Sequence, residues 1–162
     1  MARARSTSAR VACCTAEPPA CNERDRADLA QTLGPRPIWL AAQVPMAELA
    51  DILVAAQIAL QRAQRLLLIL SPVQSGDGAA MASAVRAAGL TVAVRSDGGD
   101  PLPDTEVYLA DHPGELGLWY RLSPLTYLGG TLRGLGETVH PHDPAVLGSV
   151  VIHGPRASAT AF

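Results

Sequence analysis

The stretch Leu66-Leu-Leu-Ile-Leu70 is followed by the loop Ser71-Pro-Val-Gln-Ser-Gly-Asp-Gly78 and then by a run of small residues that ends near Gly89. Five consecutive apolar residues without polar alternation are typical of a strand that is buried on both faces. The Pro and Gly residues of the loop mark the end of that strand. This part of the sequence therefore predicts a buried strand, a loop and a helix, in that order.

The same alternation continues on both sides of this unit. Asn22 is suited to cap a helix over residues 23–32, which Gly34 and Pro35 would end. The spacing of apolar residues predicts a helix over residues 46–65, and a second helix over residues 114–122 would end before Pro124. Apolar runs predict strands at residues 38–42, 91–95, 106–110, 125–128 and 150–153. Strands that alternate with helices form right-handed βαβ units. The predicted fold class is therefore α/β, a doubly wound, Rossmann-like parallel sheet with flanking helices.

Composition agrees with one globular domain and excludes several classes of protein. The chain has 162 residues, of which 48% are hydrophobic and 17% charged. Its 13 basic and 15 acidic residues give a net charge of −2, which disfavours nucleic acid as a partner. The longest apolar runs are far shorter than the ~18 residues that a transmembrane helix needs.

The first 17 residues differ from the rest of the chain. They are rich in Arg and Ser, and their apolar part is too short for the hydrophobic region of a signal peptide. We expect residues 1–17 to be a disordered or misassigned segment ahead of a domain over residues 18–162. The spacing of Cys13, Cys14 and Cys21 supports neither a disulfide framework nor a paired zinc site.

Ligands of such sheets bind outside the carboxyl ends of the strands, which here means the loops at residues 43–48, 72–78, 111–115, 129–143 and 153–156. The glycines of residues 129–136 either expose backbone N–H groups to an anion or serve only a tight turn. His140-Pro-His-Asp143 contains metal-ligand types, but Pro141 and the lack of further ligands nearby favour helix capping and ligand hydrogen bonding by His140 and Asp143. We therefore expect no metal.

No catalytic residue is assigned from the sequence. His112 and His153 are isolated, and no Ser or Cys has the sequence context of a nucleophile.

Four ordered segments resemble the 3-deoxy-D-manno-octulosonic acid (Kdo) transferase family: Val107-Tyr-Leu-Ala-Asp-His-Pro-Gly-Glu-Leu-Gly-Leu-Trp-Tyr-Arg-Leu-Ser-Pro124, Leu128-Gly-Gly-Thr131, His140-Pro-His-Asp-Pro-Ala-Val-Leu-Gly148 and His153-Gly-Pro155. The resemblance runs from about Pro18 to Pro155 and corresponds to the C-terminal, donor-binding half of that GT-B glycosyltransferase. It implies that CMP-Kdo is bound as the donor substrate, without a cofactor. The family's N-terminal half and final helices are not matched.

The resemblance also implies which residues bind the sugar nucleotide. They belong to three loops and are Pro72, Val73, Pro113, Gly114, Glu115, His140, Pro141, His142 and Asp143. Val73 replaces the arginine of the family's Pro-Arg dipeptide, which weakens the expected binding because Val supplies no charged fork. Glu115 is either a ligand contact or an acid in the first turn of a helix.

Three further expectations concern the arrangement of these loops. Asp143 keeps a carboxylate where the family has Glu, and His140 replaces Asn. We expect Glu115 and Asp143 to face one cleft, with the Gly129-Gly130 turn at its floor. Glu48 matches a family Glu only approximately and is either a ligand contact or a solvated acid at a helix start.

Two functions follow from these observations. In the first, the chain is a donor-binding domain related to the lipid A Kdo transferase of lipopolysaccharide biosynthesis. It would be inactive alone, because the family's N-terminal half holds both the acceptor site for the lipid A precursor and the general base. A separate N-terminal half is one partner that this function allows. Its expected location is the cytoplasm, or the cytoplasmic face of the inner membrane within a full-length enzyme. In the second, it is a non-catalytic nucleotide-binding or protein-interaction module whose site has drifted.

Overall fold

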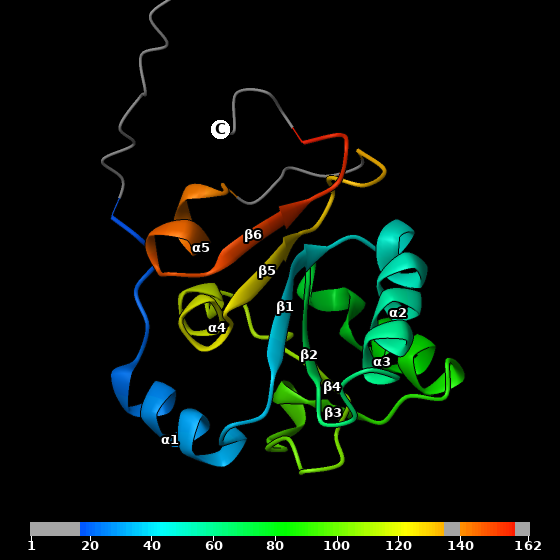
Figure 1. Ribbon diagram of the computed structural model, residues 1–162, viewed down its shortest axis with the longest axis horizontal. Helices are drawn as coiled ribbons and strands as arrows, with labels where there is room; N and C mark the ends of the chain where they lie inside the picture. Colours follow the sequence, from blue (N-terminus) through cyan, green and yellow to red (C-terminus); the bar gives the residue numbers. More distant parts are fainter. Residues whose placement is uncertain (1–16, 135–139, 158–162) are drawn as a thin grey trace, which may run out of the picture.

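The computed structural model describes residues 17–134 and 140–157 (Figure 1). The N-terminal segment that we expect to be disordered or misassigned, with Cys13 and Cys14, therefore lies outside the described residues except for Glu17. The same holds for the end of the glycine-rich stretch, residues 135 and 136.

The described part of the chain contains one six-stranded sheet. Its strands are β1 (Ile38–Val44), β2 (Leu67–Pro72), β3 (Val92–Val94), β4 (Val107–Leu109), β5 (Leu125–Leu128) and β6 (Val150–His153). They lie in the order β3-β4-β2-β1-β5-β6, and every neighbouring pair is parallel. The prediction of a parallel, doubly wound α/β fold is confirmed.

Helices cover both faces of this sheet (Figure 1). They are α1 (Glu23–Leu33), α2 (Met46–Leu60), α3 (Gly78–Ala87), α4 (Leu116–Leu122) and α5 (His142–Val146), with short 3-10 turns η1 (Ser75–Asp77) and η2 (Arg95–Asp97). One core lies between the sheet and α2 and α3, and the other lies between the sheet and α1 and α4. Right-handed crossovers explain this division, because the chain winds from β1 toward β3 in its first half and toward β6 in its second.

Local signals account for the ends of two helices. The Asn22 side chain accepts a hydrogen bond of 3.0 Å from the backbone N–H of Arg24, and Gly34 ends α1 with a φ of +58°, as the sequence predicted. The next helix, α2, stops at Leu60 instead of reaching residue 65. The backbone N–H of Leu66 bonds to the carbonyl of Ala63, in a turn that reverses the chain into β2.

A buried arginine ties together the amino ends of the central strands. The guanidinium of Arg36 donates hydrogen bonds of 2.6 to 3.4 Å to the carbonyls of Arg65, Leu66, Leu102 and Thr105. Burial lowers the pKa of this group. These bonds hold the sheet at the edge opposite to the one where ligands of such folds bind.

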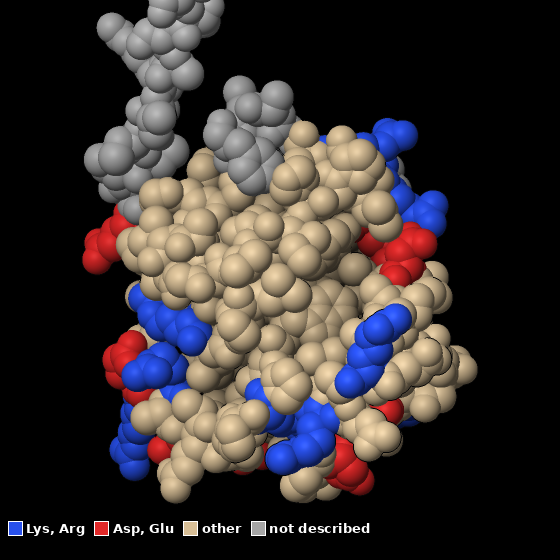
Figure 2. Space-filling view, in the orientation of Figure 1, with Lys and Arg blue, Asp and Glu red and all other residues tan. Residues whose placement is uncertain are grey.

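The second half of the sheet is less covered than the first. No described helix lies over β5 and β6 on the α2 side, and an apolar groove of about 610 Å³ lies there, lined by residues such as Trp39, Tyr127 and Ile152. In Figure 2, charged side chains lie mainly around the margin of the face on which β5 and β6 are seen. No helix in the described ranges is long and apolar enough to cross a membrane.

Candidate functional site

A cleft of about 390 Å³ lies at the carboxyl ends of β1, β2 and β4. Its walls are the loop after β2 and the loop after β4, and Gln43 of β1 contributes to its lining. The topological switch point of the sheet lies between β1 and β5, next to Gln43. Open parallel sheets bind their ligands at this edge, near the switch point.

Two of the three predicted loops meet at this cleft. Pro72 at the end of β2 and Val73 just after it line the cleft, and Pro113 and Gly114 line it from the loop after β4. Val73 is 37% exposed, so a longer side chain at this position has room to extend. Gly114 has a φ of +83°, a conformation that glycine adopts without strain.

The cleft is polar but lacks a cationic anchor. Among its described lining residues are Gln43, Ser71, Gln74, Ser75 and Asp111, and neither Lys nor Arg. The Asp111 carboxylate is already bound by Ser96, whose backbone N–H and hydroxyl lie 3.0 and 2.7 Å from its two oxygens. The site can therefore bind a ligand through neutral hydrogen bonds, and it lacks the charged fork that clamps a phosphate.

Glu115 binds an arginine of the protein itself. Its carboxylate oxygens lie 3.2 and 3.3 Å from guanidinium nitrogens of Arg95, which also lies 5.7 Å from the ring centroid of Trp119. Burial lowers the pKa of Arg95, but the interactions with Glu115 and Tyr108 together outweigh burial, and the pKa is raised. Glu115 stands at the start of α4 and is not among the residues that line the cleft. Its role as a ligand contact stays a prediction.

Glu48 organises the turn that follows β5. Its side chain is fully buried at the start of α2, where one carboxylate oxygen accepts hydrogen bonds of 2.8 Å from the Tyr127 hydroxyl and the Gly130 backbone N–H. The other oxygen accepts bonds of 2.9 and 2.7 Å from the backbone N–H groups of Leu132 and Arg133. Both expectations for Glu48 are wrong, because its oxygens are taken up by the protein and no part of it is solvated.

This network also shows what the backbone N–H groups of the glycine-rich turn bind. Backbone N–H groups there do surround an anion, as such turns can. The anion is the carboxylate of Glu48, and the N–H groups of Gly130, Leu132 and Arg133 are therefore not available to a phosphate. An ion pair of 2.8 Å between Arg133 and Asp51 joins the same turn to α2 a second time.

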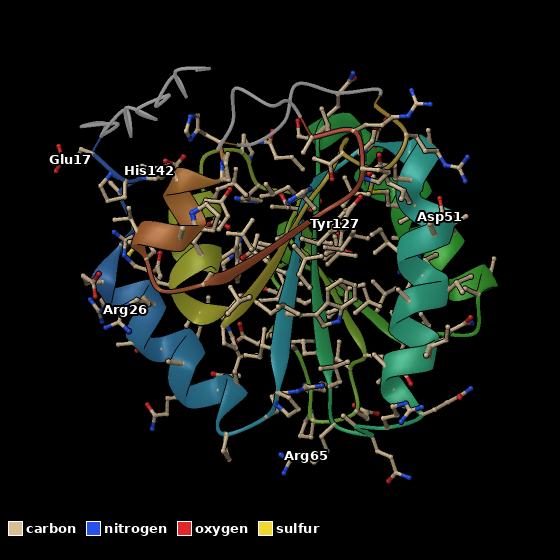
Figure 3. The ribbon with its side chains drawn as sticks, turned by 45° about the horizontal axis from the view of Figure 1, so that its top comes forward. Glu17, Arg26, Asp51, Arg65, Tyr127 and His142 are labelled. Carbon is tan, nitrogen blue, oxygen red and sulfur yellow. The ribbon has the colours of Figure 1, made fainter. Side chains whose placement is uncertain are left out.

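The tyrosine in this network, Tyr127 of β5, is buried. It is labelled in Figure 3. Burial raises the pKa of Tyr127 to about 12, and its hydrogen bond to the Glu48 carboxylate contributes to the rise. The neutral phenol therefore serves as a hydrogen-bond donor at physiological pH.

The third predicted loop lies elsewhere. His140 is exposed, Pro141 is buried, and His142 and Asp143 are half-buried at the start of α5, which packs on α4 and β6. In Figure 3, His142 lies on one side of the sheet and Asp51 of α2 on the other. None of the four residues lines the cleft formed by the first two loops.

The loop keeps one feature of the expected capping. The backbone N–H of His142 donates to Nδ1 of His140 over 3.3 Å. Asp143 lies near Tyr120 of α4, where burial raises the pKa of the phenol and the Asp143 charge raises it further.

The expected shared cleft for Glu115 and Asp143 is therefore not what the structure shows. Glu115 is turned to Arg95, and α5 carries Asp143 onto α4. The two isolated histidines also separate, since His112 lines the cleft and His153 contacts the carbonyl of Gly154.

The roles of two residues in the predicted loop at residues 43–48 were not foreseen from the sequence. Gln43 has a φ of +50° and lines the cleft, while Glu48 is the buried anchor described above. The signals for Glu48 were its place in the first turn of a predicted helix and its approximate match to a Glu of the family. Its hydrogen-bond partners are 79 to 85 residues away in sequence, beyond the reach of any local pattern.

Comparison with known proteins adds independent evidence. No protein-family model matches the sequence. Among solved structures, this chain is similar to the crystal structure of the C-terminal CMP-Kdo binding domain of WaaA from Acinetobacter baumannii, with a TM-score of 0.77 and 31% sequence identity. The match covers 82% of this chain and 70% of that chain. The shared fold, the extent of the match and the sequence identity show that the chain belongs to the Kdo transferase family, whose C-terminal domain it matches.

Proposed function

We propose that this chain is a donor-binding domain and that the cleft between β2 and β4 binds the nucleotide of CMP-Kdo. The observation that carries the proposal is the convergence of residues 71–76 and 110–114 on one cleft beside the switch point of the sheet. The similar domain of WaaA is described as one that binds CMP-Kdo, which names the ligand class.

The composition of the cleft sets the expected affinity. Because Val73 replaces an arginine and no described lining residue is Lys or Arg, no guanidinium or ammonium group clamps the phosphate. Binding then rests mainly on hydrogen bonds and on contacts with Pro72 and Pro113. We expect a dissociation constant for CMP in the micromolar range, weaker than a site with the arginine would give.

We expect catalysis to need a group from outside the described residues. A glycosyl transfer requires a base for the attacking hydroxyl. The carboxylates near the site are engaged, Glu48 by the turn after β5, Asp111 by Ser96 and Glu115 by Arg95. We propose that transfer to a lipid A precursor, at the cytoplasmic face of the inner membrane, takes place only with an N-terminal acceptor half.

Titration calorimetry with CMP tests the proposal. Gly76 lines the cleft, and a Cβ built on it meets nothing within 4 Å, so we expect Gly76→Trp to place a bulky ring at the cleft without disturbing the backbone. Saturable heat in the micromolar range that Gly76→Trp abolishes supports the proposal. Ala80→Trp, on the exposed side of α3, is the matched control and should bind as the unaltered chain does.

Absence of CMP binding would favour the second function, a non-catalytic interaction module. If the unaltered chain gives no heat at millimolar CMP, the site has lost its ligand and the chain is better described as an interaction module with the family's fold.

A further inference from the structure

Gln43 has an unusual backbone conformation at the edge of the cleft. In residues 17–134 and 140–157 it is the only non-glycine residue with a positive φ, at +50°. A residue with a Cβ is disfavoured in this left-handed region. Such a conformation persists only where the surrounding structure holds it.

The neighbouring strands hold Gln43 in this conformation. The register between β1 and β2 shifts between Ala41 and Val44, on either side of the residue. The backbone N–H of Gly129 bonds to the carbonyl of Ala42 over 2.8 Å, and a Cβ on Gly129 would overlap the carbonyl of Gln43. The glycine after β5 is therefore needed for the unusual turn at the end of β1.

The side chain that this turn presents has no hydrogen-bond partner among the described residues. Gln43 is half-buried and lines the cleft, and its amide makes no hydrogen bond to any described residue. Glu48, five residues later, has both of its oxygens fully used. An amide offers two donors and one acceptor without a charge, which suits hydroxyl groups and the edges of bases.

We infer that the amide of Gln43 hydrogen-bonds an uncharged group of the nucleoside and is a specificity-determining residue of the cleft. This inference rests on the function proposed above and adds a residue that the family resemblance did not assign. Because the amide is neutral, its contribution to affinity should change little with salt concentration, whereas the contribution of an ion pair would fall.

The variant Gln43→Asn separates this role from a structural one. Asn keeps the amide but is one methylene shorter, and it adopts the left-handed conformation more readily than most residues. We expect its thermal midpoint to be unchanged or raised, and its affinity for both CMP and cytidine to fall by about three- to tenfold. Gln43→Gly, which also relieves the backbone, should bind equally weakly. Gln64→Asn makes the same chemical change at an exposed position outside the cleft and should bind normally.

Each result has a definite meaning. Normal CMP affinity in folded Gln43→Asn and Gln43→Gly would overturn the inference and leave the proposed function intact. A loss confined to CMP, with cytidine unaffected, would also overturn it, because the contact would then be with the phosphate. Absence of CMP binding by the unaltered chain would overturn both.

Discussion

Replacing Glu48 with glutamine tests how the turn after β5 is held in place. The carboxylate accepts four hydrogen bonds, two at each oxygen, from Tyr127, Gly130, Leu132 and Arg133. A glutamine has the same shape but only one accepting oxygen. Its NH₂ group would face two of the four donors, and turning the amide over would only exchange which two are affected.

The size of the effect follows from these contacts. In the better orientation the oxygen keeps Leu132 and Arg133, and the Tyr127 hydroxyl rotates to accept from the NH₂ group. The N–H of Gly130 is then buried without a partner, which costs about 1 to 3 kcal/mol, and the retained bonds lose their charge assistance. We expect Glu48→Gln to lower the free energy of unfolding by about 2 to 4 kcal/mol, and the melting temperature by roughly 5 to 15 °C.

Thermal unfolding followed by circular dichroism measures this change, and amide hydrogen exchange locates it. Exchange should speed up at Gly130, Leu132 and Arg133 more than in β1 or β2. Glu23→Gln is the matched control, because Glu23 is exposed and its ion pair with Arg26 at the surface contributes little. An unchanged melting temperature in Glu48→Gln, with normal protection of the turn, would refute the anchoring role.

Three further predictions concern the cleft, alkaline pH and the β5 turn. Val73→Arg should strengthen CMP binding by up to about ten- to a hundredfold in calorimetry, with a smaller gain at high salt; equal affinity at low salt would mean that residue 73 does not face the nucleotide. Burial raises the pKa of Tyr127 to about 12, above the ordinary value of ~10, so folded stability should fall between about pH 10 and pH 12 by at most about 3 kcal/mol. Urea titrations across that range should show the fall, and Tyr127→Phe should make it smaller, while the share due to Tyr120, whose pKa burial also raises, should remain. Gly129→Ala should destabilise the fold by about 3 kcal/mol or more, because its Cβ overlaps the Gln43 carbonyl, whereas a melting curve for Gly76→Ala should be almost unchanged.

The fold was predictable because its signals are local. The run at residues 66–70 shows a strand buried on both faces, and Asn22 and Gly34 mark the ends of α1 through bonds made within a few residues. All six strands were placed to within a few residues. The alternation of strands and helices, together with right-handed crossovers, then leaves few topologies to choose from.

The site was only partly predictable because its interactions are long-range. Pro72, Val73, Pro113 and Gly114 meet at the cleft because they follow neighbouring strands, which the topology dictates. The partner that Glu115 takes, Arg95, is 20 residues away, and its presence beside Trp119 depends on how α4 packs. Such choices are made by packing and charge in three dimensions.

The turns around β1 illustrate the same limit. Nothing in the sequence around Gln43 indicates a positive φ, since Gly and Asn are the residues that usually mark it. The reason lies in Gly129, 86 residues later, which makes room for the Gln43 carbonyl.

Chemical-shift mapping of ¹⁵N-labelled protein during a CMP titration tests the central claim most directly, because it reports both binding and its location. We expect saturable shifts, with a micromolar dissociation constant, at the backbone N–H groups of Gln43, Val73, Gly76 and Gly114. Residues that line the apolar groove beside α2, such as Ala59 and Ile152, should not shift. Absence of shifts at millimolar CMP, or shifts confined to residues outside the cleft, would contradict the claim.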